Sequence, residues 1–241
     1  MSSASELAAQ IDDAHRERRL LDATRQPPLD LGEAYAVQRA LTALRTRRGA
    51  RPVGWKLGYT SAAMREQMGV ASPNYGPLLD TMLITDGRVP DALVHPRVEP
   101  EIAVVLGADL RPGEARAALE VVDSVWRDYR FTLELNTADG SSAAAVALGP
   151  TLGPDGLDVV AVRMLRNGQE VGASTGAAAM GHPLRALDWL VSTLAADGEL
   201  LRPRDVVITG GLTAAVPVEP GDVVEAVFGD DVVLRLRSGQ D

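Results

Sequence analysis

Two glutamates stand two positions apart at the start of a predicted strand. Glu99 and Glu101 precede the apolar run 102–106, which ends at Gly107. In an extended chain alternate side chains point to the same face, so the two carboxylates project together. Two like charges held side by side share a cation, share a proton or separate into water. The pair therefore predicts either a site for a hard divalent cation with oxygen ligands or a solvated strand entrance.

Two further charged residues interrupt apolar or glycine-flanked runs. Glu120 lies within the run 118–122, where a charge is costly unless it is paired or bound to a metal. We expect Glu120 to supply a third metal ligand. Lys56 lies between Gly54 and Gly58 in a short predicted strand, where it is either a partly buried cation or a surface lysine.

The elements that must position these residues change in character along the chain. Residues 5–24 and about 30–48 have helical periodicity, with Ser5 as the expected N-cap of the first helix and Asp30 at the start of the second. From residue 51 onward strands and turns dominate, with a hairpin signal at Asn167-Gly168 and one long helix after Pro183. We expect a helical segment over residues 1–50 and a β-rich domain over residues 51–241.

Composition and charge exclude several functional classes. The formal net charge of -9 argues against nucleic-acid and anionic-membrane partners, which need basic patches. The chain has no cysteine, so disulfides, thiolate metal sites and cysteine nucleophiles are excluded. It shows no secretory apolar region and no apolar stretch of about 20 residues. We expect a soluble, cytoplasmic protein.

Three histidines and one serine motif offer other chemistry. Residues 172–176 fit the G-x-S-x-G pattern of serine hydrolases, but the one later histidine, His182, follows after eight residues with no acid between. We expect His15, in a charged helix, to be exposed to solvent, and His95, before a proline, to be structural. His182, at a helix start, either contacts substrate or fixes its loop.

Several motifs in order give the chain a family resemblance. It resembles the fumarylacetoacetate hydrolase superfamily, in the branch of 2-oxo-4-pentenoate hydratases and 4-oxalocrotonate decarboxylases of aromatic meta-cleavage pathways. The motifs are G-W-K-L-G-Y-T-S (54–61), Q-M-G-V-A-S-P-N-Y-G (67–76), V-E-P-E-I-A (98–103), A-L-E-V-V-D-S (118–124), A-D-G-S-S (138–142), G-H-P-L (181–184) and T-G-G-L-T-A-A-V-P-V-E-P-G-D (209–222).

The resemblance implies a fold and a set of site residues. The fold would be α+β, a mixed β-roll of the fumarylacetoacetase C-terminal type (51–241, catalytic) with an N-terminal helical segment (1–50). The chain would form a homo-oligomer and could associate with a pathway hydratase. The implied site residues are Glu99, Glu101 and Glu120 as metal ligands, Lys56, Asp139 and Ser142 as catalytic residues, and Thr209, Gly210, His182 and Asn74 as substrate contacts.

Asn74 separates the two activities of this branch, and the chain departs from the family pattern at Val125, at Gly140 and in a shorter segment between Leu110 and Ala118. Hydratases of this branch carry an aspartate where this chain has Asn74, which cannot act as a carboxylate base, so the motifs favour the decarboxylases. Val125 replaces a usual arginine, a change expected to alter how a second substrate carboxylate is held. Gly140 replaces a usual asparagine.

These features give a hypothesis for the reaction. Mg²⁺ or Mn²⁺ would chelate the 2-oxo acid end of a 2-oxo-3-enedioate, and loss of the distal carboxylate would leave a metal-bound dienolate. Lys56, with a pKa lowered by burial beside the cation, would neutralise charge or move a proton. Alternatives are a 2-hydroxydienoate hydratase, an acylpyruvate C–C hydrolase with His182 as the base, and a protein without catalysis that binds oxo acids or a hydratase.

Overall fold

The computed structural model describes residues 4–239, apart from the side chains of residues 63, 67 and 68. The α-helices are α1 (Ala4–Arg16), α2 (Leu31–Arg47), α3 (Ala62–Met68), α4 (Leu133–Ala138) and α5 (Pro183–Ala196). The strands are β1 (Pro52–Gly58), β2 (Asn74–Leu79), β3 (Leu83–Ile84), β4 (Arg97–Leu106), β5 (Pro112–Val122), β6 (Ala143–Leu152), β7 (Ala161–Arg166), β8 (Gln169–Thr175), β9 (Val206–Ile208), β10 (Val216–Pro217), β11 (Val223–Phe228) and β12 (Val232–Arg237).

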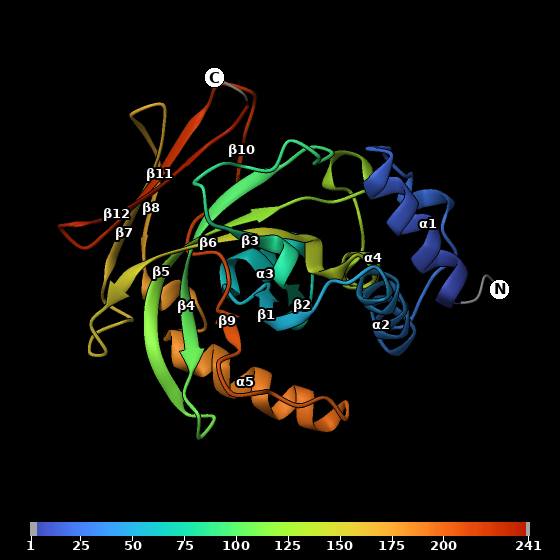
Figure 1. Cartoon of the computed structure of the whole chain (residues 1–241), viewed down its shortest axis with the longest axis horizontal. Helices are drawn as coiled ribbons and strands as arrows, with labels where there is room; N and C mark the ends of the chain where they lie inside the picture. Colours follow the sequence, from blue (N-terminus) through green and yellow to red (C-terminus); the bar gives the residue numbers. More distant parts are fainter. Residues whose placement is uncertain (1–3, 240–241) are drawn as a thin grey trace.

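The strands form two sheets. The larger has eight strands in the order β2-β1-β9-β4-β5-β6-β3, with β10 beside β4, and it is mixed because β1 runs parallel to β9 and β3 parallel to β6. The smaller is antiparallel, in the order β12-β11-β7-β8. It lies at one end of the molecule, and α1, α2 and α4 gather at the other (Figure 1). Side chains of the two long central strands, β4 and β5, belong to more than one of the packed hydrophobic clusters.

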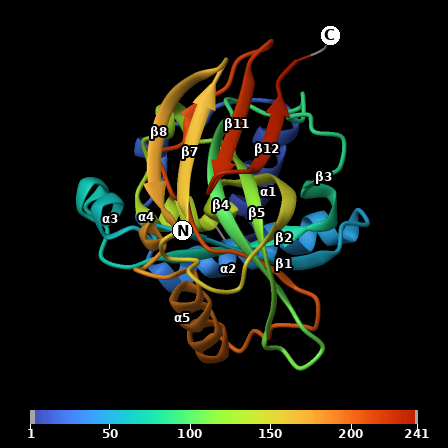
Figure 2. The ribbon, with the colours of Figure 1, turned by 90° about the vertical axis from the view of Figure 1, so that its left-hand side faces the viewer.

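The main core lies between the two sheets. Ile102 and Leu119 of the large sheet pack in one buried cluster with Met164, Phe228 and Leu236 of the small sheet. The small sheet lies across β4 and β5 (Figure 2). Full burial of each such side chain contributes about 1.5–3 kcal/mol. This packing fixes one face of β4 and β5, so the alternate side chains, including Glu99 and Glu101, must face the other way.

The first helix is shorter than the sequence predicts. It ends at Arg16 rather than near residue 24, because Arg18 takes a left-handed backbone conformation (φ 52) that ends the helical turn. Leu21 then forms an isolated bridge with Trp126. The second helix begins as predicted: Asp30 caps it and exchanges hydrogen bonds with Glu33 in a capping box.

The N-terminal helices share a core with residues far along the chain. Leu7 and Ile11 of α1 and Val37 of α2 pack with Trp126 and Leu135. This cluster crosses the expected boundary at residue 50, and the division into 1–50 and 51–241 stays a prediction. Because the same cluster holds the segment between β5 and β6, the N-terminal helices brace a loop next to the glutamates.

Helix α5 covers another part of the large sheet. His182 caps it and Pro183 is its first residue, as the sequence predicts. Leu187 and Leu190 pack with Leu57 of β1 and Val207 of β9. Among the helices of residues 4–239, none is both long and apolar enough to cross a membrane.

Candidate metal centre and active site

The large sheet brings the three predicted glutamates together. Glu99 and Glu120 are direct partners across the antiparallel β4–β5 pair, and Glu101 follows Glu99 on the same face. One carboxylate oxygen from each of the three lies within 4.8 Å of those of the others. Glu101 and Glu120 are fully buried, and Glu99 is half-buried. The solvated strand entrance left open by the sequence is therefore excluded.

The donor set fits a divalent cation. Oε1 of Glu101 and both side-chain oxygens of Glu120 are buried and accept no hydrogen bond from the described part of the chain, although Oε2 of Glu120 is 3.1 Å from Nζ of Lys56. One ammonium group does not balance three clustered carboxylates, and uncompensated buried charge is strongly unfavourable. A small cation that prefers oxygen ligands, such as Mg²⁺ or Mn²⁺, would satisfy all three oxygens at once.

The electrostatics of the cluster lead to the same conclusion. Burial, and then the neighbouring Glu120, raise the pKa of Glu99 to about 8, with Lys56 opposing the shift. Burial and the two other glutamates raise the pKa of Glu101 as well. Glu99 of the metal-free cluster therefore holds a proton at neutral pH, and a bound cation would displace it.

Lys56 lies beside the glutamates rather than on the surface. Its Nζ is 3.1 Å from Oε2 of Glu120 and donates a hydrogen bond of 2.8 Å to the carbonyl of Ser141. The side chain is 3% exposed, which decides between the two alternatives left by the sequence. Burial lowers the pKa of Lys56, but the three glutamates raise it by more. In the metal-free protein Lys56 is therefore a cation, and the lowering of its pKa beside a bound metal ion stays a prediction.

Two consecutive glycines let the glutamates approach the backbone. The amide of Gly210 donates a hydrogen bond of 2.7 Å to Oε2 of Glu101. A Cβ on Gly211 would lie 2.3 Å from Oε2 of Glu99, closer than any side chain permits. Thr209 does not point to the cluster: its hydroxyl donates to the carbonyl of Ile102 within the sheet. Gly210 and Thr209 therefore position β4, and neither lines the adjoining cavity.

A hydrogen-bonded loop forms a second wall of the site. The Asn136 side chain donates to the Ser142 hydroxyl (2.8 Å), and Asn74 donates to the side-chain oxygen of Asn136 (2.9 Å). The Ser141 hydroxyl donates to Oδ1 of Asn74 (2.8 Å). Asn136, Ser141 and Ser142 line the cavity, whereas Asn74 is fully buried behind them. Asn74 thus holds the loop rather than offering a group to a ligand.

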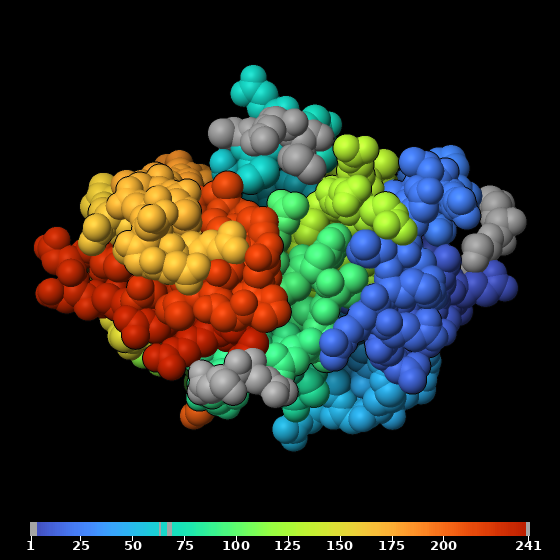
Figure 3. All heavy atoms as spheres, turned by 90° about the horizontal axis from the view of Figure 1, so that it is seen from above, coloured from blue at the N-terminus to red at the C-terminus, as the bar shows by residue number. Residues whose placement is uncertain are grey.

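Glu99 joins the cluster to a cavity of about 370 Å³, while Glu101 and Glu120 lie buried behind its wall. The residues that line it fall within the segments 56–64, 97–99, 122–142 and 211–215. These segments lie next to one another on one face of the molecule (Figure 3). Its lining includes Lys56 and Glu99 at the cluster, Tyr59 and Met64 on one side, and Arg97, Tyr129 and Phe131 on the other. The volume suits a small organic acid.

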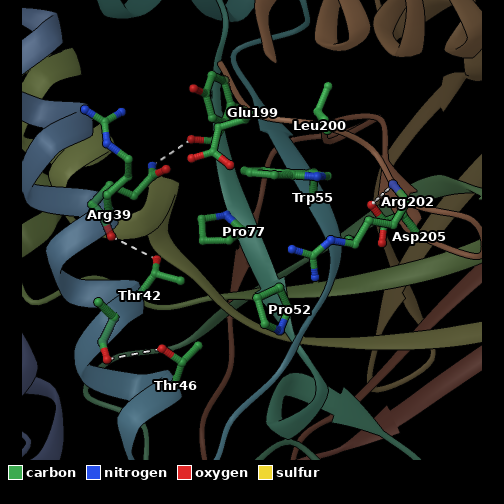
Figure 4. A pocket seen from close by; sticks show the side chains of 14 residues that line it. Arg39, Thr42, Thr46, Pro52, Trp55, Pro77, Glu199, Leu200, Arg202 and Asp205 are labelled. Carbon is green, nitrogen blue, oxygen red and sulfur yellow. Dashed lines mark hydrogen bonds between the residues drawn. The ribbon is translucent and has the colours of Figure 1, made fainter. Parts of the chain in front are cut away.

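A second cavity of about 310 Å³ lies elsewhere on β1, between α2 and the chain after α5 (Figure 4). Trp55 and Pro77 contribute an apolar wall, and Arg39, Glu199 and Arg202 lie around it. Because side chains alternate along a strand, Trp55 lines this cavity while its neighbour Lys56 lines the first. The three-carboxylate cluster belongs to the first cavity, which is therefore the candidate active site.

His182 and Asp139 also lie outside the cavity lining, as Asn74, Thr209 and Gly210 do. His182 accepts the amide of Leu184 as the cap of α5 and is 4.0 Å from Asp158. Asp139 is buried, and its Oδ2 accepts hydrogen bonds from the Ser124 hydroxyl and the amide of Val125. Asp139 therefore fixes the ends of the loop that carries Ser141 and Ser142.

A further expectation from the sequence is wrong: His15 is not a solvent-exposed helix residue. Its Nε2 is 2.6 Å from Oδ1 of Asp139, because α1 packs against the loop after β5. Val125 is fully buried in the core under the N-terminal helices, and the expected effect of its replacing an arginine stays a prediction. The predicted structural role of His95 agrees with its contact to the carbonyl of Ser124 and its stacking on Tyr129.

Sequence reasoning missed Arg97 and Tyr129. Arg97 is two positions before Glu99 and therefore shares its face of β4, a signal that was present in the alternation of the strand. Its guanidinium lies 4.1 Å from the centre of the Tyr129 ring. Tyr129 reaches this place through the chain after β5, which no local sequence pattern predicts.

Comparison with known proteins agrees with the observed fold and site. Residues 79–236 match the family model described as fumarylacetoacetate (FAA) hydrolase C-terminal. The chain belongs to the fumarylacetoacetate hydrolase family. The expected fold class, an α+β mixed β-roll of this type with an N-terminal helical segment, is confirmed.

The relatives carry two activities. The chain is 38% identical to 4-oxalocrotonate decarboxylase from Pseudomonas putida over 213 residues, 81% of each chain. It is 37% identical to 2-keto-4-pentenoate hydratase from Paraburkholderia xenovorans over 216 residues, 83% of this chain and 80% of the relative. The solved 4-oxalocrotonate decarboxylase from Pseudomonas putida G7, complexed with magnesium and adipate, superposes with a TM-score of 0.91 at 31% identity, covering 98% of this chain and 97% of that one.

Proposed function

We propose that the chain is a divalent-metal-dependent decarboxylase of a 2-oxo-3-enedioate. One observation carries the proposal: Glu99, Glu101 and Glu120 cluster beside Lys56 next to a small-molecule cavity, with three buried carboxylate oxygens that accept no hydrogen bond from the described residues. Glu99, Glu101 and Glu120 would hold Mg²⁺ or Mn²⁺. The magnesium and adipate, a six-carbon dicarboxylate, of the solved decarboxylase support both the metal and the substrate class.

The chemistry needs a place for an electron pair. When bound, the ion would supply positive charge that draws electrons toward the 2-oxo acid end of the substrate. In the decarboxylation the C5–C6 bond breaks and C6 leaves as CO₂. The electron pair of that bond moves through C4 and C3 onto the oxygen of C2, and a dienolate results.

The chain's own residues supply charge and orientation at that oxygen. Lys56, a cation held between Glu120 and the carbonyl of Ser141, is placed to stabilise the developing negative charge and to return a proton to the dienolate. The Ser142 hydroxyl and the Asn136 amide line the cavity and would hold the substrate by hydrogen bonds.

Two alternatives use the same site. The hydratase relatives make addition of water to a 2-hydroxydienoate the second candidate, but the position at which those enzymes tend to carry aspartate is here the buried amide of Asn74. An acylpyruvate hydrolase is less well supported, because its candidate base His182 caps α5 and does not line the cavity.

The test compares two substrates with and without Mg²⁺ after chelation. The purified protein is incubated with 2-oxohex-3-enedioate and separately with 2-hydroxypenta-2,4-dienoate, while ultraviolet absorbance and released CO₂ are followed. The proposal predicts metal-dependent CO₂ from the first compound. Loss of the dienoate signal without any CO₂ from the first compound would replace it by the hydratase, and no change with either would refute both.

Assembly and location extend the proposal. We propose a homo-oligomer, able to bind a pathway hydratase, as the family resemblance implies; light scattering of the chain alone and mixed with a hydratase checks both. The cytoplasmic location expected from the sequence is checked by cell fractionation.

A further inference from the structure

Two cations line the active-site cavity, and they lie at different depths. Among the described residues of the lining, Lys56 and Arg97 carry positive charge. Lys56 is buried at the glutamates, whereas Arg97 is half-buried at the start of β4. The proposed metal and Lys56 account for the 2-oxo acid end of a substrate. Arg97 is left without a role in that chemistry.

Arg97 is held in place without an anionic partner. Its guanidinium stacks 4.1 Å from the centre of the Tyr129 ring. No carboxylate within residues 4–239 comes within 4.0 Å of its nitrogens, although Glu99 and Asp128 line the same cavity. A guanidinium that stacks on a ring keeps its N–H groups free for a planar anion.

The ring under Arg97 is itself rigidly placed. The Tyr129 hydroxyl donates to the carbonyls of His95 and Val122, each at 3.1 Å. Asp128 and Tyr129 both take left-handed backbone conformations (φ 58 and 56), which residues other than glycine rarely adopt. Such conformations cluster at ligand clamps and active sites, where the surrounding structure imposes them.

The spacing along β4 matches a short dicarboxylate. At about 3.4 Å per residue, Arg97 lies about 7 Å along the strand from Glu99 and about 14 Å from Glu101. With carbon–carbon bonds of about 1.5 Å, a six-carbon dioate spans about 6 Å between its end carbons. A substrate whose first two carbons lie at Glu99 is therefore long enough to place its other carboxylate at Arg97, which lines the same cavity.

We propose that Arg97 binds the distal carboxylate of the substrate and selects dicarboxylic over monocarboxylic 2-oxo acids. This inference rests on the proposed function, since it assumes that the 2-oxo acid end binds at the glutamates. The substrate has a second carboxylate and the monocarboxylate product does not, so the charge of Arg97 has a partner in the substrate only. Arg97 is therefore a specificity residue, and by binding the C6 carboxylate it orients the C5–C6 bond that breaks.

The experiment measures binding rather than turnover. The Mg²⁺-loaded protein is titrated calorimetrically with 2-oxoadipate and with 2-oxohexanoate, which share a 2-oxo acid end and chain length and differ in the distal carboxylate. A charge-assisted, bidentate hydrogen bond predicts that wild type prefers 2-oxoadipate by about ten- to a hundredfold. In Arg97→Met this ratio falls to near one while the affinity for 2-oxohexanoate stays within about twofold. Arg97→Lys keeps part of the preference.

A matched control separates position from charge. Arg111 is 85% exposed at the far end of the β4–β5 pair, so Arg111→Met keeps the wild-type ratio. The inference is overturned if wild type does not discriminate or if Arg97→Met still does. If Arg97→Met does not fold, Arg97→Gln, which also removes the charge, provides the same comparison. The titration does not measure CO₂, so the two proposals can fail separately. If Arg97→Met loses discrimination but wild type shows no decarboxylase activity in the separate CO₂ assay, only the proposed reaction is refuted. If wild type is a decarboxylase but Arg97→Met still discriminates, only the role of Arg97 is refuted.

Discussion

Replacing Gly211 by alanine perturbs the metal cluster without substituting any of its three glutamates. The new Cβ would lie 2.3 Å from Oε2 of Glu99 and 2.7 Å from its Cδ. An ordinary contact begins at 3.4 Å, so that oxygen must move by 3.4 − 2.3 = 1.1 Å. Gly211 does not have a positive φ, so the alanine adds no backbone strain.

A shift of this size is large on the scale of metal coordination. Metal sites tolerate errors of about 0.2 Å in ligand distance, and Mg²⁺ demands near-ideal geometry. We therefore expect Gly211→Ala to weaken Mg²⁺ binding by about 10–100-fold, the range for disturbing groups that orient ligands. The loss of activity should be recovered in part by raising the Mg²⁺ concentration.

The assay is calorimetric titration of chelated protein with Mg²⁺ and with Mn²⁺. Gly153→Ala is the control, because a Cβ there meets nothing within 4 Å and its φ is also not positive. Both variants should match wild type in circular dichroism. If Gly211→Ala binds Mg²⁺ as tightly as Gly153→Ala and wild type do, Glu99 is not a ligand and the geometry argued for the cluster is wrong.

Three other predictions test the surroundings of the cluster. Lys56→Met should lower kcat for 2-oxohex-3-enedioate by about 10²–10⁴-fold while calorimetry still detects 2-oxoadipate binding, since the proton and charge at C2 are lost but the distal contact is kept. Burial raises the pKa of Glu99 from 4.5 to about 8, so the folded metal-free state keeps a proton that the unfolded state releases. Thermal unfolding should therefore show stability falling as the pH rises from about 5 to about 8. Bound Mg²⁺ should oppose this fall. His15→Ala leaves Oδ1 of buried Asp139 without its 2.6 Å partner and should lower the free energy of unfolding by about 1–3 kcal/mol in urea titrations; a change within error would mean that the contact contributes nothing.

The sequence predicted the centre of the site better than its rim. Alternation along a strand places Glu99 and Glu101 on one face from local sequence alone, and the cost of burying a charge singled out Glu120. The direct pairing of Glu99 with Glu120 then follows from the β4–β5 register. Local signals likewise predicted the cap at Asp30 and the start of α5.

What the sequence could not show depends on contacts between distant segments. His15 and Asp139 are 124 residues apart, and a histidine between alanine and arginine in a helix carries no sign of such a partner. The burial of Val125 under the N-terminal helices could not be predicted either, because a loop residue has no periodicity that tells which way its side chain points. Arg97 was overlooked although its alternation with Glu99 was visible, because its role depends on Tyr129, delivered by a strained turn.

The central claim is that Glu99, Glu101 and Glu120 hold the ion on which decarboxylation depends. The most direct test is label release from 2-oxohex-3-enedioate carrying ¹³C at C6, with chelated wild type and Glu101→Gln across a Mg²⁺ titration. The account predicts ¹³CO₂ from wild type that rises with Mg²⁺ and saturates, and none above background from Glu101→Gln, which remains folded. Equal release from Glu101→Gln, or release from chelated wild type without added metal, would contradict it.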